Sequence, residues 1–162
     1  MPQLSHISSY GEANMVDISH KLKSERSAVA RAYLEINTAI IHLINNDQLE
    51  KGDLYATARI AGIQAAKRCS DLIPLCHPLV ITKVSIDIVL EASFLVITAQ
   101  CKTTAQTGVE MEALTAASVA ALVLYDMCKG VDKGIVIKNI ALLEKTGGKS
   151  GRWNTTSQHT DD

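Results

Sequence analysis

Aromatic side chains are scarce in this chain, at 4% of residues, although 47% of the residues are hydrophobic. The core must therefore be filled by Ala, Val, Ile and Leu, which allow close backbone approach, and we expect tight helix packing. Net charge is also nearly absent, because 16 Lys plus Arg face 17 Asp plus Glu, a formal charge of -1. The chain therefore lacks the net positive charge that is typical of nucleic-acid binders. No nucleic-acid partner is expected, and any anion site must be local.

Motifs of secretion, disulfide pairing and membrane insertion are missing as well. The four cysteines form no CxxC pair, and residues 1–15 lack the basic and then apolar pattern of a signal peptide. The longest apolar run, residues 119–125, is far shorter than the roughly 18 residues of a membrane span. We therefore expect a soluble cytoplasmic protein with reduced thiols and no membrane partner.

The length of the chain favours one domain. At roughly 100 to 200 residues per domain, the 162 residues predict a single unit over 1–162. Residues 1–22 form an irregular N-terminal arm in this interpretation. Residues 146–162, rich in Gly, Ser, Thr and charge, are expected to be a mobile tail unless a ligand orders them.

Hydrophobic periodicity predicts four strands and three helices. Asn37 caps a short helix that ends at residues 45–47, and Asp53 opens a longer helix that Pro74 stops. The predicted strands are 25–36, 82–91, 94–103 and 135–145, and a long helix covers 110–129. The short connection at 91–93 makes the second and third strands an antiparallel hairpin.

This order of elements predicts an α+β fold of the ferredoxin-like, split βαβ type, with an antiparallel sheet and helices on one face. Such a sheet leaves its other face bare. On the expected register that face carries the apolar residues Val29, Val89, Val96, Ile140 and Leu142. Another subunit is therefore expected to cover it, which predicts a homo-oligomer.

Cys76 and His77 lie between Pro74 and Pro78, in a loop expected after a helix. Prolines restrict φ and hold the imidazole in a defined place, which suits acid–base chemistry. A purely structural histidine is the alternative. Zinc binding by Cys69, Cys76 and His77 is disfavoured, because their spacing matches no usual ligand pattern, and we predict no metal ligand here.

Acidic residues stand at both ends of the predicted long helix. Glu110 and Glu112 gain roughly 0.3 to 1 kcal/mol from the helix dipole, which is a sufficient structural reason for them. Residues two apart point in different directions, but both can line a pocket at the first turn. Asp126 and Lys129 share a face, and a solvated ion pair is their usual role. The surrounding sequence is largely apolar, however, which indicates that Asp126 has a task or a partner.

A glycine-rich segment, residues 145–151, resembles a phosphate loop only superficially. A Walker A motif needs glycine where this chain has Leu143, and a helix must follow it, so a P-loop is rejected. The segment can still close over a polyphosphate through its amides and lysines, with a disordered basic tail as the alternative. Lys51 precedes the Asp53 cap and places a lysine at a helix N-terminus, which favours an anion.

Long stretches of the chain resemble one family, the cyclic pyranopterin monophosphate synthases, also called molybdenum cofactor biosynthesis protein C. They occur in order along nearly the whole chain, which makes them far more specific than a short motif. The stretches are MVDIS at 15–19, KGD at 51–53, ATARIAGIQAAKR at 56–68, DLIPLCHP at 71–78, TGVEMEALTAAS at 107–118, YDMCK at 125–129 and GGKSG at 147–151.

The resemblance implies a reaction and a set of residues for it. The reaction converts 3',8-cyclo-7,8-dihydro-GTP to cyclic pyranopterin monophosphate and releases pyrophosphate. Asp126 is implied as the principal catalytic residue, Lys51 and Lys129 as catalytic or phosphate-contacting residues, and His77 as a candidate for proton transfer. The residues implied in substrate binding are Leu75, Cys76, His77, Glu110, Met111, Glu112, Lys145, Lys149 and Arg26.

The resemblance also implies an assembly, a hexamer built as a trimer of dimers with sites at the dimer interface. No tightly bound cofactor is expected, and Mg²⁺ is expected only as a companion of the triphosphate. Two alternatives stay open at this point. One is a non-catalytic ferredoxin-like binding module, and the other is a nucleotide hydrolase acting directly on GTP, which the missing P-loop disfavours.

Overall fold

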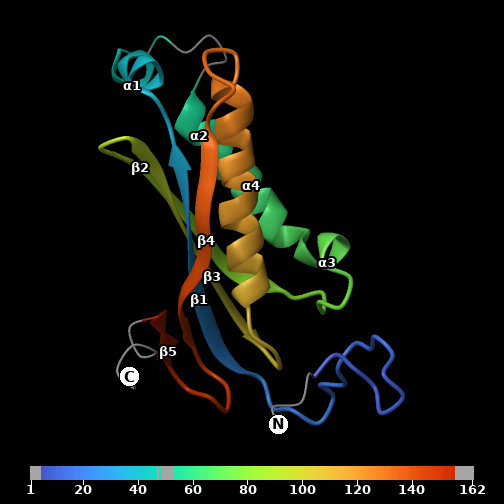
Figure 1. The fold of residues 1–162 in the computed structure, drawn as a ribbon. Helices are drawn as coiled ribbons and strands as arrows, with labels where there is room; N and C mark the ends of the chain where they lie inside the picture. The colour runs from blue at the N-terminus through green and yellow to red at the C-terminus, as the bar shows by residue number, and fades with distance from the viewer. Residues whose placement is uncertain (1–4, 47, 49–52, 156–162) are drawn as a thin grey trace, which may run out of the picture.

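The structure is a computed structural model that describes residues 5–46, 48 and 53–155 (Figure 1). Its helices and strands follow in the order β1 (Ser24–Glu35), α1 (Thr38–Asn45), α2 (Leu54–Lys67), α3 (Cys69–Leu72), β2 (Ile81–Glu91), β3 (Phe94–Ala105), α4 (Glu110–Cys128), β4 (Val136–Thr146) and β5 (Trp153–Asn154).

The strands form one sheet in the order β2-β3-β1-β4-β5, and all neighbouring pairs are antiparallel. The first four strands have the order of a ferredoxin-like sheet, so the predicted fold class is confirmed. Helices α2 and α4 lie side by side on one face of the sheet (Figure 1).

Small residues permit this close packing. The inward side of β1 carries Ala28, Ala30 and Ala32, which are all buried. In α2, a Cβ atom at Gly62 would lie 2.9 Å from the carbonyl oxygen of Ala116 in α4. The scarcity of aromatic residues is therefore matched by a helix pair whose backbones nearly touch.

The predicted helix starts are confirmed by their caps. The Asn37 side chain accepts a hydrogen bond from the Ile40 amide at 3.0 Å, and Asp53 accepts one from the Ala56 amide at 2.8 Å. The expectation of one helix continuing to Pro74 was wrong. The helix breaks at Arg68, whose φ of -111° and ψ of 16° lie outside the helical region, and α3 follows.

A bulge in β4 changes which of its residues face the core. The pairing with β1 shifts between Arg31 and Tyr33, next to Asn139, which has a φ of 51°. As a result Leu142 pairs with Ala30 and packs against the core. The expectation that Leu142 lies on the bare face was wrong, because a bulge shifts the alternation of inward and outward residues by one.

The strand β5 was not predicted from the sequence. Its two residues, Trp153 and Asn154, pair with Lys145 and Glu144 of β4 and extend the sheet at that edge. The Gly-rich segment between β4 and β5 therefore forms a loop beside the start of β1, and this loop brings Lys149 toward the site described below.

Helix α4 is long and apolar enough to cross a membrane by length and composition alone. In the folded chain it packs against α2 and the sheet, and its buried residues lie on that packed side. The same test is passed by the core helices of soluble proteins. We therefore interpret α4 as the core helix of this domain.

Candidate active site

Two adjoining cavities open where α4 begins, at the end of the sheet that also carries the N-terminal arm. The larger has a volume of about 640 Å³ and the smaller about 120 Å³, and Thr107 lines both. The larger cavity is lined by His20, Lys21, Leu22, Ser24, Arg26, Gln106, Thr107, Gly148, Lys149 and Ser150. The smaller is lined by His6, Leu75, Cys76, His77, Leu79, Thr107, Gly108, Glu110, Met111 and Glu112.

The larger cavity is cationic. Lys21, Arg26 and Lys149 line it together with His20, and no carboxylate is among the described residues that line it. Arg26 is held in place by its own hydrogen bonds, since Nε donates to the Ala105 carbonyl at 3.0 Å and Nη2 to the Gln106 carbonyl at 3.2 Å. Fixed positive charge around a cavity of this size suits a polyphosphate.

A glycine turn closes this cavity from the β4–β5 side. Gly147 and Gly148 have φ values of 93° and 74°, which favour glycine. A Cβ atom at Gly147 would collide with the Glu25 carbonyl oxygen, and one at Gly148 with the Arg26 guanidinium. Both glycines are therefore needed for the loop to lie against Arg26 and present Lys149 to the cavity.

The Ser24 hydroxyl adds an available hydrogen-bonding group to the same cavity. Its oxygen is buried and has no hydrogen-bond partner within the described part of the chain. Buried polar atoms are nearly always paired, so an unsatisfied hydroxyl in a cavity wall needs an explanation. A ligand oxygen or a water in the cavity would satisfy it.

The smaller cavity contains carboxylates. Glu110 lies at the first turn of α4 and accepts an ion-paired hydrogen bond from Lys145 Nζ of β4 at 3.0 Å. Gly108 makes room for this arrangement, because a Cβ atom there would collide with the Glu110 carboxylate. Glu112 points the other way, as the helical spacing predicts, and is only 3% exposed.

Burial raises the pKa of the Glu112 carboxyl, and the neighbouring Glu110 carboxylate raises it further. Three thiols share this environment. Burial raises the pKa of Cys69 to about 11, that of Cys101 to about 12 and that of Cys76 in the same direction. These shifts keep the thiols protonated, which makes Cys76 a wall of the pocket rather than a nucleophile.

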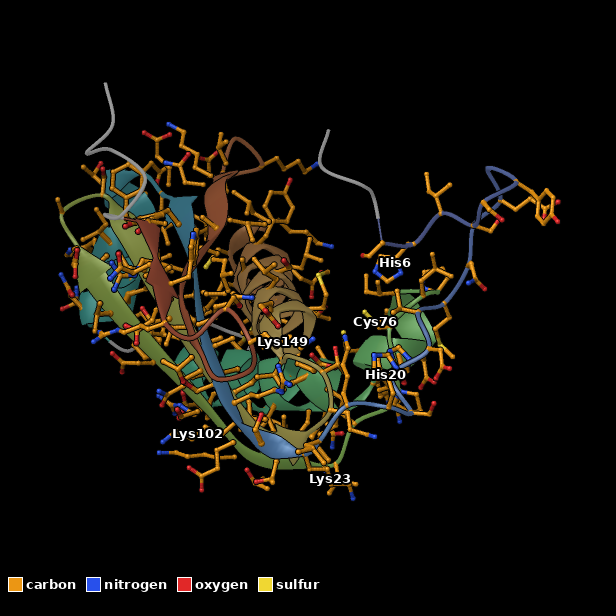
Figure 2. The ribbon with its side chains drawn as sticks, turned by 90° about the horizontal axis from the view of Figure 1, so that it is seen from below. His6, His20, Lys23, Cys76, Lys102 and Lys149 are labelled. Atoms are coloured by element: carbon orange, nitrogen blue, oxygen red, sulfur yellow. The ribbon has the colours of Figure 1, made fainter. Side chains whose placement is uncertain are left out.

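His77 anchors the N-terminal arm. Its Nε2 lies 2.8 Å from the Val16 carbonyl oxygen. A carbonyl can only accept a hydrogen bond, so Nε2 carries the proton and donates it, and Nδ1 is the ring nitrogen left for another partner. Seen from this end of the molecule, Figure 2 shows His6, His20 and Cys76 on the α3 side of α4.

Asp126 and Lys129 lie at the opposite end of α4. Lys129 Nζ contacts Asp126 Oδ1 at 2.6 Å, and the two side chains are 49% and 58% exposed, respectively. The hydrogen bond to Asp126 raises the pKa of Lys129. The predicted ion pair is confirmed, but Asp126 is exposed despite its apolar sequence neighbours, because it faces away from the core.

The structure thus gathers most of the predicted site residues around the two cavities. These residues are Arg26, Leu75, Cys76, His77, Glu110, Met111, Glu112, Lys145 and Lys149. Asp126 and Lys129 are separated from them by the length of α4, and Lys51 lies outside the described residues. Sequence reasoning missed His6, His20, Lys21, Ser24, Gln106 and Thr107 as lining residues.

The fold and the cavities define a ferredoxin-like α+β protein with a cationic pocket beside a buried carboxylate. The MoaC family model matches residues 15–148, so the chain belongs to the MoaC family, the cyclic pyranopterin monophosphate synthase family. Membership supports a role in molybdenum cofactor biosynthesis.

Proposed function

We propose that this protein converts 3',8-cyclo-7,8-dihydro-GTP to cyclic pyranopterin monophosphate and releases pyrophosphate, as a lyase acting on a phosphorus–oxygen bond. One observation carries the proposal: a cationic cavity large enough for a triphosphate adjoins a small cavity with two carboxylates, and Thr107 lines both. A substrate with a polyanionic end and a hydrogen-bonding ring system fits this pair of cavities, with one end in each.

The triphosphate occupies the cationic cavity. Arg26, Lys149 and Lys21 neutralise its charge, and their positive charge stabilises the departing pyrophosphate. The Ser24 hydroxyl donates to a phosphate oxygen and so gains a partner, which it lacks among the residues that the structure describes.

The purine-derived ring system enters the small cavity. The N–H donors of its pyrimidine edge face Glu110 and Glu112, and the walls are Leu75, Cys76 and Met111. Burial raises the pKa of Glu112, so this carboxyl holds its proton more readily than an exposed glutamate does, which suits a group that moves protons while rings open and close. Lys145 is ion-paired with Glu110 and holds that neighbouring carboxylate in a fixed orientation.

Asp126 and Lys129 reach the substrate from a second subunit. Asp126 follows Glu112 by fourteen positions in α4, which is roughly 21 Å along the helix axis. Proton transfer needs contact within about 3 Å. Glu112 and Asp126 of one chain therefore cannot both exchange protons with the same ring system. A symmetric dimer brings Asp126 and Lys129 of one chain to the cavities of the other.

The protein is cytoplasmic and forms a hexamer as a trimer of dimers. It has no nucleic-acid partner and no tightly bound cofactor, and Mg²⁺ accompanies the triphosphate. The carboxylates of the site serve proton transfer and recognition rather than metal binding.

The test is Asp126→Asn in the full-length protein, compared with the wild type on the cyclised GTP substrate. The near-isosteric change is expected to retain substrate affinity and lose most turnover, because it removes the proton-accepting charge. Wild-type turnover in this variant would remove Asp126 from the mechanism. Absence of pyrophosphate and of an oxidisable pterin with the wild type would favour a binding module, and steady phosphate release from GTP would favour a hydrolase.

A further inference from the structure

The N-terminal arm, residues 5–23, begins with a compact hairpin outside the region that the family model matches. Ile7 and Ala13 form an antiparallel bridge, and the Asn14 amide donates to the His6 carbonyl at 2.9 Å. Ser8 closes the turn, since its hydroxyl accepts from the Tyr10 and Glu12 amides. The hairpin therefore has a defined shape of its own, with His6 at its base.

The side chains of His77 and Gln106 attach the arm to the domain through hydrogen bonds to its backbone carbonyls. His77 Nε2 donates to the Val16 carbonyl at 2.8 Å, two residues after the hairpin ends at Asn14. Farther along, the Gln106 side-chain amide donates to the Lys21 carbonyl at 2.9 Å. The His77 contact is the one nearer the hairpin, so it controls where the base of the hairpin lies.

That position brings a second imidazole to the carboxylate-lined cavity. His6 lines it together with Cys76, His77, Glu110 and Glu112, although His6 is 71 residues distant from His77 in sequence. Figure 2 shows His6 on the same side of α4 as Cys76. His6 is exposed, so its ring is accessible to a molecule that enters the cavity.

We propose that His6 contacts the substrate in the small cavity, and that His77 is the positioning residue that holds the hairpin there. Hydrogen bonding to Val16 occupies the Nε2 of His77, whereas the exposed His6 ring lines the cavity and is accessible to the ligand. The inference rests on the proposed function only for the identity of the ligand. Its chemistry requires a hydrogen-bonding heterocycle of the guanine type attached to a polyphosphate.

The contact is tested by calorimetric titration of the full-length protein with GTP, and by the KM and kcat of pyrophosphate release from the cyclised substrate. His6→Ala is expected to weaken GTP binding roughly three- to tenfold, which is the loss of one hydrogen bond, and to raise KM more than it lowers kcat. Tyr10→Ala at the exposed tip of the same hairpin is the matched control, with GTP affinity within about twofold of the wild type.

The role of the His77–Val16 hydrogen bond is tested separately, by hydrogen exchange of residues 5–16. His77→Ala is expected to raise exchange throughout the hairpin, whereas His77→Gln keeps a donor for the Val16 carbonyl and restores protection. If hydrogen exchange in His77→Ala equals that of the wild type, His77 does not position the hairpin, whatever the activity of that variant.

The two proposals fail in different ways. A wild-type protein that binds GTP through His6 but releases no pyrophosphate from the cyclised substrate would refute the proposed function and leave the His6 contact standing. Unchanged GTP affinity in His6→Ala, or no GTP binding by the wild type, would overturn the His6 contact.

Discussion

A site shared between subunits makes a quantitative prediction for mixed oligomers. Glu112 and Asp126 lie roughly 21 Å apart along one helix, and we propose that each site takes one of them from each chain. Glu112→Gln and Asp126→Asn are each expected to be inactive as pure proteins. In a mixed dimer, one site carries both substitutions and the other site carries neither.

The size of the recovery follows from statistics. When equal amounts of the two variants associate at random, about half of the dimers are mixed and half of the sites in those dimers are intact, so about one quarter of wild-type activity returns. Co-expression with two different affinity tags, followed by tandem purification, removes the few hexamers that hold a single variant, and about one quarter of the activity is still expected. Pyrophosphate release is the assay. No recovery in purified mixed oligomers would refute the reasoning and place both carboxylates of a site on one chain.

Three further predictions concern stability. Burial raises the pKa of Glu112 above its unfolded value, so this carboxyl costs stability as pH rises through the folded pKa. Glu112→Gln is expected to raise the melting temperature at about pH 8, with a smaller gain at about pH 5, and an equal gain at both would contradict this. Gly62→Ala forces α2 from α4 and is expected to destabilise by about 1–3 kcal/mol, whereas Gly130→Ala, with open space around its Cβ position, stays near wild type in denaturant unfolding. Gly147→Ala should cost about 1–3 kcal/mol and weaken GTP binding by displacing Lys149, and an unchanged affinity would argue against a role for the loop.

Local patterns were sufficient to predict the core of the fold. The alternation in β1 and the hairpin of β2 and β3 follow from period-two patterning, and the caps Asn37 and Asp53 mark two helix starts. Together with the order of elements, these signals lead to a ferredoxin-like sheet, because few topologies bury four such strands and two long helices.

The structure differs from the sequence prediction at short, local features that leave no periodic pattern in the sequence. The bulge at Asn139 shifts the register of β4 by one residue, and nothing in an apolar run such as 140–143 indicates where the shift occurs. The two-residue β5 is too short for any periodic signal. The break at Arg68 precedes Pro74 by six residues, so proline alone did not locate the end of the helix.

The site was predictable only in part. Motif stretches indicated Glu110, Glu112 and His77, but the pairing of Glu110 with Lys145 joins residues 35 apart, and the contact of His77 with Val16 joins residues 61 apart. His6 and Ser24 carry no local signal at all, since a histidine in a polar arm and a serine at a strand start are both common. Only the tertiary fold assigns them to cavity walls.

We propose that this protein converts the cyclised nucleotide to a pterin and cleaves one phosphorus–oxygen bond of the triphosphate. The most direct measurement incubates purified full-length protein with 3',8-cyclo-7,8-dihydro-GTP and quantifies pyrophosphate and oxidised pterin in the same samples, with GTP as the parallel substrate. The account predicts one pyrophosphate for each cyclic pyranopterin monophosphate formed, and neither product from GTP. Pyrophosphate without pterin, or the same pyrophosphate release from GTP, would contradict it.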